Sequence, residues 1–274
     1  MSPALLAAEP FEAPFISTFT YGRRQLLFFA SDHDSGLHST NVRAIRSTIE
    51  DHSIDVVILE GFESSMGESP ESIRSQAEPC ATEPLLPDCS EMDQAILVAS
   101  VRGIPFVGAE PGPTAEWEQI RDLSDGEYTV EDYIALELSR YLVLISRGEE
   151  RVPNDAVPGR LGRLIDYYRK ILPLPAEYSV DSYRQWLKKH FGTDAFVVGA
   201  EQLAPKPEAG SSILQKLSYL TTRTRDINLL KVIEQELRSH DRVLVIYGSA
   251  HLAALRKVLS SATDRSSDKK ARPR

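Results

Sequence analysis

The chain has 274 residues, of which 42% are hydrophobic and 26% charged, and its formal net charge at pH 7 is −9. These values are typical of a soluble globular protein with a sizeable core. The acidic balance argues against a nucleic-acid binder, because phosphate contacts need a basic surface. No apolar run approaches the roughly 20 residues of a membrane span, and the first ten residues lack the features of a signal peptide. We expect a cytoplasmic protein; the mature form of an exported protein would look the same.

The chain begins with a strand–helix–strand pattern. Residues 24–30 (RQLLFFA) form an apolar run that predicts a buried strand, and residues 39–52 carry apolar side chains at helical spacing. Residues 55–62 (DVVILEGF) are rich in β-branched residues, as is typical of a strand buried on both faces of a parallel sheet. This order predicts a βαβ unit with a right-handed crossover.

Residues 63–90 are rich in Pro, Ser and Glu and show no sustained period, which predicts a long loop. The loop contains the only two cysteines, Cys80 and Cys89. Neither belongs to a CxxC pair, which argues against a structural zinc site. Two free thiols in a reducing compartment is the simpler interpretation, and a local disulfide is the alternative for an exported protein. A helix over 91–103 and a strand over 104–111 follow.

The middle of the chain has a helical pattern at residues 130–148, 161–172 and 180–192. A long amphipathic helix over 213–239, a buried strand over 242–251 and a closing helix over 252–262 complete the predicted elements. We therefore predict an α/β fold with a mostly parallel central sheet flanked by helices. Residues 1–262 form one domain with a helical insertion at about 128–195, and residues 263–274 are a disordered basic tail.

Acids and histidines follow each predicted strand of the sheet. In an open parallel sheet, ligands bind beyond the carboxyl ends of the strands. Imidazole nitrogens and carboxylate oxygens are also the donors that divalent metals use. Any one of these residues taken alone is more often a strand-end cap than a ligand. The set comprises Asp32, His33 and Asp34 after the first strand, Glu60 after the second, Glu110 after the third and His251 after the last.

Two of these positions share a local sequence. His33 ends the tetrapeptide ASDH, and His251 ends the tetrapeptide GSAH, each after a buried apolar run. The small residues Ala30 and Gly248 allow the backbone to bend or to approach a ligand closely. We therefore predict that the two imidazoles, which are far apart in the sequence, meet at one site.

These segments resemble the TraB/Tiki superfamily, which includes TraB/PrgY proteins, Tiki metalloproteases, ChaN-like haem-binding proteins and, more distantly, erythromycin esterases. The family pattern is a G-x-x-H motif, a helix, a strand ending in an acid, an arginine-containing helix and a second G-x-x-H motif. Here ASDH matches the first motif with Ala30 in place of Gly, SIDVVILEGF matches the strand, and VLVIYGSAHL matches the last motif. The segment TTRTRDINLL, with Arg225 and Asp226, resembles the arginine helix. The resemblance covers roughly residues 24–110 and 215–260.

The resemblance implies a metal-dependent hydrolase that cleaves peptide bonds. His33, Glu60 and His251 would hold Mn²⁺, Co²⁺ or Zn²⁺ with a position open for water. Glu110 or Asp34 would act as general base or complete the ligand set. Arg225 would pair with a carboxylate or stabilise the oxyanion; the alternative is a surface ion pair.

Two other functions remain open on the same residues. One is a metal-independent esterase of the erythromycin-esterase type, in which a histidine activates water. The other is a ChaN-like module for haem or another ligand, with tyrosines of the helical middle lining a pocket. For the metal-dependent hydrolase and for the esterase, the substrate would be a peptide or a small molecule. His38 and Glu91 are second-tier site candidates, the first in the turn before a helix and the second at a helix start.

Overall fold

The computed structural model describes residues 13–33, 39–63, 70–82, 89–148 and 150–268. The chain divides into two compact units. We call residues 1–110 with 226–274 the sheet unit and residues 111–225 the helical unit, and we describe each by itself. Among the described residues, no helix is both long enough and apolar enough to cross a membrane.

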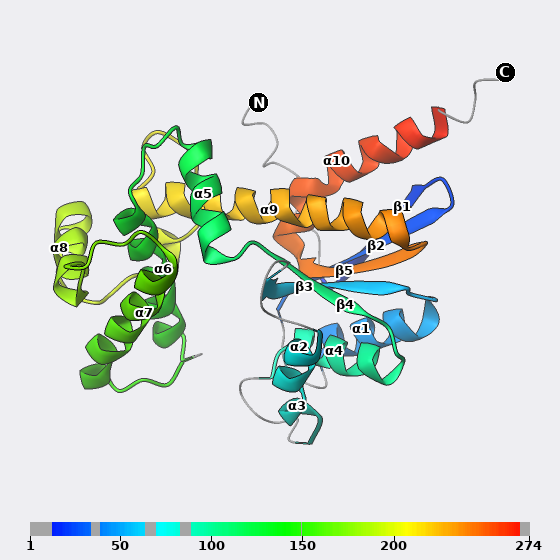
Figure 1. Cartoon of the computed structure of the whole chain (residues 1–274), viewed down its shortest axis with the longest axis horizontal. Helices are drawn as coiled ribbons and strands as arrows, with labels where there is room; N and C mark the ends of the chain where they lie inside the picture. The colour runs from blue at the N-terminus through cyan, green and yellow to red at the C-terminus, as the bar shows by residue number, and fades with distance from the viewer. Residues whose placement is uncertain (1–12, 34–38, 64–69, 83–88, 149, 269–274) are drawn as a thin grey trace. The chain divides into compact units, whose positions relative to one another are not determined.

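The sheet unit contains a five-stranded, mostly parallel sheet with the order β1-β2-β5-β3-β4 (Figure 1). Among the described strands, β1 and β2 pair antiparallel and the other pairs are parallel. The α/β fold with a mostly parallel sheet is therefore confirmed. The sequence does not predict β1, because this edge strand buries only Phe19 and has no apolar run. The strands are β1 (Phe15–Tyr21), β2 (Arg24–Ser31), β3 (Val56–Glu63), β4 (Phe106–Glu110) and β5 (Arg242–Gly248).

Helices cover both faces of this sheet (Figure 1). One apolar cluster joins one sheet face to α1 (Thr40–Asp51), α2 (Pro70–Ala77) and α4 (Glu91–Val101). A second cluster joins the opposite face to α10 (Ser249–Asp268) and to the second half of α9 (Ile213–Ser239). Strands β2, β3 and β5 are buried on both faces, which is why their sequences are continuous apolar runs rather than alternating ones.

The segment between β3 and α4 differs from the predicted loop. It contains α2 and the short helix α3 (Pro79–Thr82), and a disulfide joins Cys80 to Cys89. The prediction of two free thiols is therefore wrong. Helix α2 buries Ile73 and Ala77 in the core beside α4, and two apolar positions are too few to produce a detectable period.

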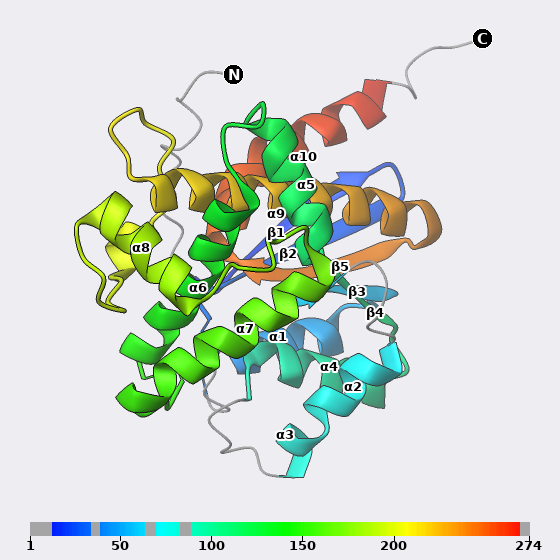
Figure 2. The ribbon, with the colours of Figure 1, turned by 60° about the vertical axis from the view of Figure 1, so that its left-hand side comes forward.

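The helical unit, whose helices α5 to α8 are drawn in green and yellow-green in Figure 2, has its own apolar core, which includes both tryptophans of the chain. Its helices α6 and α7 contact each other, as do α7 and α8. The helical character of the middle of the chain agrees with the sequence pattern, whereas α5 has no counterpart among the predicted helices. The helices are α5 (Pro113–Leu123), α6 (Val130–Ser146), α7 (Val157–Ile171), α8 (Val180–Phe191) and two 3₁₀ turns, Asn154–Ala156 and Ala200–Gln202.

The C-terminal elements agree with the sequence pattern except at their ends. Helix α9 has the predicted bounds, and its residues belong to the helical unit up to Arg225 and to the sheet unit from Asp226. Strand β5 ends at Gly248 and helix α10 begins at Ser249, so His251 lies in the first turn of a helix rather than at the end of the predicted strand. The same helix continues to Asp268, whereas a disordered tail is predicted from residue 263. Residues 269–274 lie outside the described part of the chain.

Candidate active site

The register of the sheet brings the ends of three strands together. Ser31 at the end of β2 pairs with Gly248 at the end of β5, and Leu59 of β3 pairs with Ile246 of β5. Because β5 lies between β2 and β3, the residues that follow these strands share one edge of the sheet. The pairing of β3 with β4 becomes irregular after Leu59, and Gly61 has φ +83°. Such bulges redirect side chains and are frequent near active sites.

Glu60 lies between the two predicted histidines. Its Oε2 is 3.7 Å from Nε2 of His33, and its Oε1 is 3.8 Å from Nε2 of His251. Oε2 also accepts a hydrogen bond from the Gly248 amide at 2.6 Å, which fixes the carboxylate against the end of β5. The structure therefore brings together the three residues that were predicted to bind a metal.

His251 is held from its other nitrogen by Asp226 of α9. The distance from Nδ1 of His251 to Oδ1 of Asp226 is 2.6 Å, and the imidazole is buried. Tyr247 packs edge-on against the same ring, with 5.3 Å between ring centroids. An ionised carboxylate accepts hydrogen bonds only, so Nδ1 carries the proton. In the neutral ring this leaves a lone pair on Nε2, the atom that faces Glu60.

His33 is held in the same way by Glu91, the first residue of α4. Nδ1 of His33 is 3.0 Å from Oε1 of Glu91, which again assigns the proton to Nδ1 and the lone pair to Nε2. The two histidines differ in exposure. The His33 side chain is 56% exposed and that of His251 only 7% exposed, so His33 forms the solvent side of the site.

The backbone at His33 has an unusual conformation. Its φ is +60°, in the left-handed region that few residues other than glycine adopt. Buried Ser31 supports this turn, because its Oγ accepts hydrogen bonds from the His33 amide and from Asn41, both at 2.9 Å. The Ser31 hydroxyl also donates to Glu91 at 2.8 Å. Non-glycine residues in this conformation cluster at functional sites.

The hydrogen bonds around Glu91 also change its acidity. Burial raises the pKa of the Glu91 carboxyl, but the hydrogen bonds from His33 and Ser31 outweigh this effect, and the net pKa is lowered. Glu91 therefore remains an anion that orients His33. This second-tier candidate is an integral part of the site.

No protein-family model and no curated protein matches this chain.

Gly248 provides space at the centre of the site. A Cβ atom at this position would lie 2.6 Å from Nε2 of His33 and 3.5 Å from Oε2 of Glu60. The second motif therefore places its glycine where a side chain would displace the first histidine. This contact explains the need for a glycine at the start of GSAH better than a bend of the backbone does.

The other predicted site residues lie elsewhere or outside the described part of the chain. Glu110 ends β4, and its Oε1 accepts hydrogen bonds from the Tyr247 hydroxyl at 3.1 Å and the Gly61 amide at 3.3 Å. It thus ties the end of β4 to its neighbour β3 and to β5, the next strand of the sheet. Asp34 and His38 lie outside the described residues.

Arg225 belongs to the helical unit, where its charge acts on Glu116 and Arg140. The sequence places it next to Asp226, the partner of His251. In the sequence, Asp226 stands out only as part of the arginine-helix motif. Its role as the partner of His251 depends on where α9 packs against the sheet, and no local pattern in the sequence reveals that.

The tyrosines considered for a haem pocket belong to the helical unit. Tyr133 is buried and its hydroxyl donates to Glu116 at 2.7 Å, while the Tyr168 hydroxyl donates to Glu137 at 3.3 Å. Both hydroxyls therefore have protein partners. Tyr141 packs against the apolar core of this unit, and Tyr167 is 48% exposed.

Carboxylates and imidazoles gather at this edge of the sheet. Glu60, Glu91 and Asp226 place three carboxylates around two imidazoles, and Nε2 of each ring faces Glu60. Histidine and carboxylate donors suit Zn²⁺ or Mn²⁺. Within the described ranges, no group of three or more His, Cys, Asp or Glu side chains is arranged as a ready metal site. The donor atoms present, imidazole nitrogen and carboxylate oxygen, are of the types that such a metal uses.

Proposed function

We propose that the chain is a hydrolase that activates water between His33, Glu60 and His251. The observation that carries the proposal is the pairing of each imidazole with a carboxylate through Nδ1, while both Nε2 atoms face Glu60. Histidines that bind metals almost always donate their second ring nitrogen to a carboxylate or carbonyl in this way. The same pairing also orients histidines that act as general bases.

Our first hypothesis is a metal-dependent hydrolase of the TraB/Tiki type that acts on peptide bonds. His33, Glu60 and His251 would hold a divalent ion, which lowers the pKa of bound water and polarises a carbonyl. Glu91 and Asp226 keep the two rings in one tautomer and one orientation, and Gly248 leaves room for the ring of His33 beside Glu60. His33, on the solvent side, is the ring nearest to an entering substrate.

A metal-independent esterase is the second hypothesis, and one observation favours it. Asp226 and the buried His251, with 2.6 Å between Oδ1 and Nδ1, have the geometry of an oriented general base. In that case Nε2 of His251 takes the proton from water, and Glu60 stabilises the resulting imidazolium. Both hypotheses use the same residues, so the presence of a metal distinguishes them.

The decisive experiment is elemental analysis of the protein purified without chelators, together with variants. We expect about one divalent ion per chain in the wild type and its loss in His33→Ala and in His251→Ala. His52→Ala is the matched control, because His52 is an exposed residue at the end of α1. Circular dichroism should show that the site variants remain folded.

Activity assays on a peptide library and on aryl esters complete this test. Under the first hypothesis chelation abolishes peptide cleavage, and Glu91→Gln lowers metal affinity by roughly 10- to 100-fold, as changes in residues behind metal ligands do. Ester cleavage that survives chelation and requires His251 and Asp226 would support the second hypothesis instead. A protein that binds no metal and hydrolyses neither class would refute the proposal.

A further inference from the structure

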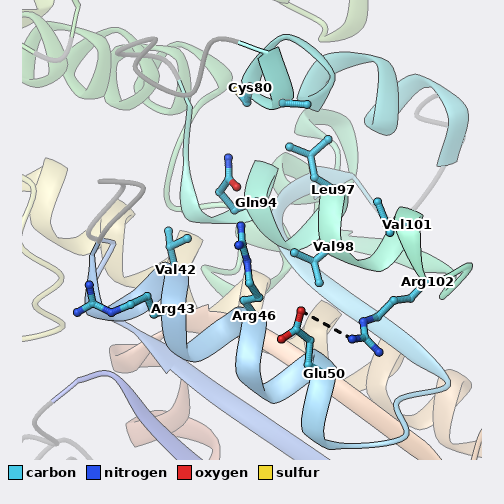
Figure 3. Close-up of a pocket in the computed structure, with 11 residues that line it drawn as sticks. Val42, Arg43, Arg46, Glu50, Cys80, Gln94, Leu97, Val98, Val101 and Arg102 are labelled. Carbon is cyan, nitrogen blue, oxygen red and sulfur yellow. Dashed lines mark ion pairs between the residues drawn. The ribbon is translucent and has the colours of Figure 1, made fainter.

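A pocket of about 820 Å³ lies in the sheet unit between α1, α3 and α4 (Figure 3). It shares no residue with the site around Glu60. Its volume falls within the range of small-molecule sites. The disulfide between Cys80 and Cys89 joins α3 to the residue before the N-cap of α4, so a covalent bond holds this wall of the pocket in place.

The polar group that points to a ligand is the amide of Gln94. This residue lines the pocket, is only 6% exposed, and its Nε2 has no hydrogen-bond partner among the described residues. A buried donor without a partner costs free energy, so native proteins rarely retain one. Nε2 only donates hydrogen bonds, so its missing partner is an acceptor, such as a carboxylate oxygen.

A positive charge lies in the same space. Figure 3 shows the Arg46 side chain of α1 reaching between α1 and α4, on the side where Gln94 lies, whereas Arg43 extends away from Gln94. Arg102, at the end of α4, forms an ion pair with Glu50 at 3.7 Å, which neutralises that part of the wall. With Arg102 paired to Glu50, the arginines Arg43 and Arg46 leave the lining positively charged, and Arg46 is the one on the side of Gln94, so the pocket suits an anionic group.

The remaining wall is aliphatic. Val42 of α1 and Leu97, Val98 and Val101 of α4 line the pocket, and Val101 is 89% exposed. The hydrogen-bond donors of Arg46 and Gln94 lie beside this apolar wall. Together they suit a ligand with an anionic head and an aliphatic body. We propose that the groove between α1 and α4 binds an aliphatic carboxylate, with its head on Arg46 and Gln94 and its chain on the three α4 side chains.

Calorimetric titration with octanoate, acetate and 1-octanol tests this proposal on the full chain. Octanoate is expected to bind, and acetate to bind more weakly, because each buried methylene contributes roughly fourfold in affinity. 1-Octanol, which lacks the charge, is expected to bind at least tenfold more weakly than octanoate. The same affinity for octanoate and 1-octanol, or for octanoate and acetate, would overturn the proposal, as would the absence of octanoate binding at millimolar concentration.

Variants locate the site and separate it from the hydrolase site. Arg46→Gln and Gln94→Leu are each expected to weaken octanoate binding at least tenfold, while Arg23→Gln, a change at an exposed arginine of the same unit, leaves it unchanged. The melting temperature of ligand-free Gln94→Leu should equal or exceed that of the wild type, since the unpartnered amide is gone. His251→Ala should bind octanoate normally. Octanoate binding that is lost in His251→Ala but retained in Arg46→Gln would place the ligand at the other site and refute the proposal.

Discussion

At the scale of single residues, Ser31 and Gly248 determine where the imidazole of His33 lies, although neither has a chemical role in the proposed reaction. Ser31 Oγ bonds to the His33 amide, Asn41 and Glu91, and so fixes the turn that carries His33. Gly248 donates its amide to Glu60 and leaves room for the ring of His33. The two residues are partners in the sheet, so one register determines both effects.

The space beside Gly248 leads to a prediction for Gly248→Ala. The added Cβ would meet Nε2 of His33, which is the end of a half-exposed side chain and moves easily. We expect stability to change by less than about 1 kcal/mol, while activity and metal affinity fall at least tenfold because His33 is displaced from Glu60. Urea unfolding and metal titration measure the two effects.

Gly210→Ala is the matched control, because a Cβ at Gly210 meets nothing within 4 Å. It should leave both stability and activity close to the wild type. A Gly248→Ala variant with full activity would show that the position of His33 beside Glu60 is irrelevant to the function.

At the scale of elements, the start of α4 connects helix formation to the site. Ser90 caps the helix, and its side chain and that of Asp93 bond reciprocally to each other's backbone amides. Glu91 is the next residue, and its negative charge also favours the helix N-terminus. The residue that orients His33 is therefore placed by the same turn that begins the helix.

Ser90→Ala should therefore affect both stability and the site. The loss of the cap is expected to cost about 1 kcal/mol, and fraying of the first turn should loosen Glu91 and reduce activity several-fold. Ser179→Ala removes an equivalent capping box from α8 in the helical unit and serves as the control. We expect a similar loss of stability there, measured by denaturant unfolding, without a change in activity or metal content. Equal activity of the two variants would argue that Glu91 does not depend on its helix.

The helices and strands that bury many side chains are the ones that the sequence predicts. Strands β2, β3 and β5 and helix α9 agree with their sequence patterns because they bury long apolar runs or stripes. Strand β1 and helices α2 and α5 were missed because each buries only a few side chains. The disulfide was misjudged because two cysteines nine residues apart say nothing about whether their side chains meet.

At the scale of the whole molecule, the helical unit contains a buried carboxylic acid, Glu116, surrounded by ionisable side chains of the same unit. Tyr133, Glu137, Arg140 and Arg225 act on Glu116. Burial is the main cause that raises the pKa of the Glu116 carboxyl to about 7. The negative charge of Glu137 raises this pKa further, whereas the positive charge of Arg140 lowers it. The folded unit thus keeps a proton that the unfolded chain releases at lower pH.

This pKa predicts how stability depends on pH. Because the folded pKa lies above the ordinary value of 4.5, stability falls as pH rises from about 4.5 to about 7, by roughly 3 kcal/mol. Glu116→Gln should remove this dependence, being more stable than the wild type at pH 8 and similar at pH 4.5. Tryptophan fluorescence is the right measurement, since Trp117 and Trp186 both belong to the helical unit.

Glu118→Gln, an exposed change in the same helix α5, should retain the pH dependence of the wild type. If Glu116→Gln also retains it, the fall in stability has another origin and Glu116 is ionised in the folded state at neutral pH.

The sequence by itself determined the parallel sheet and the residues at the strand ends. Apolar runs determine which segments become central strands, and the ends of parallel strands meet at one edge of the sheet. The proximity of His33, Glu60 and His251 could therefore be predicted. Only the tertiary structure decided the partners of these residues. Glu91 and Asp226 reach the imidazoles because α4 and α9 pack against the sheet at particular angles and depths. Packing of this kind depends on contacts between segments far apart in the chain, and local sequence patterns carry no information about such contacts.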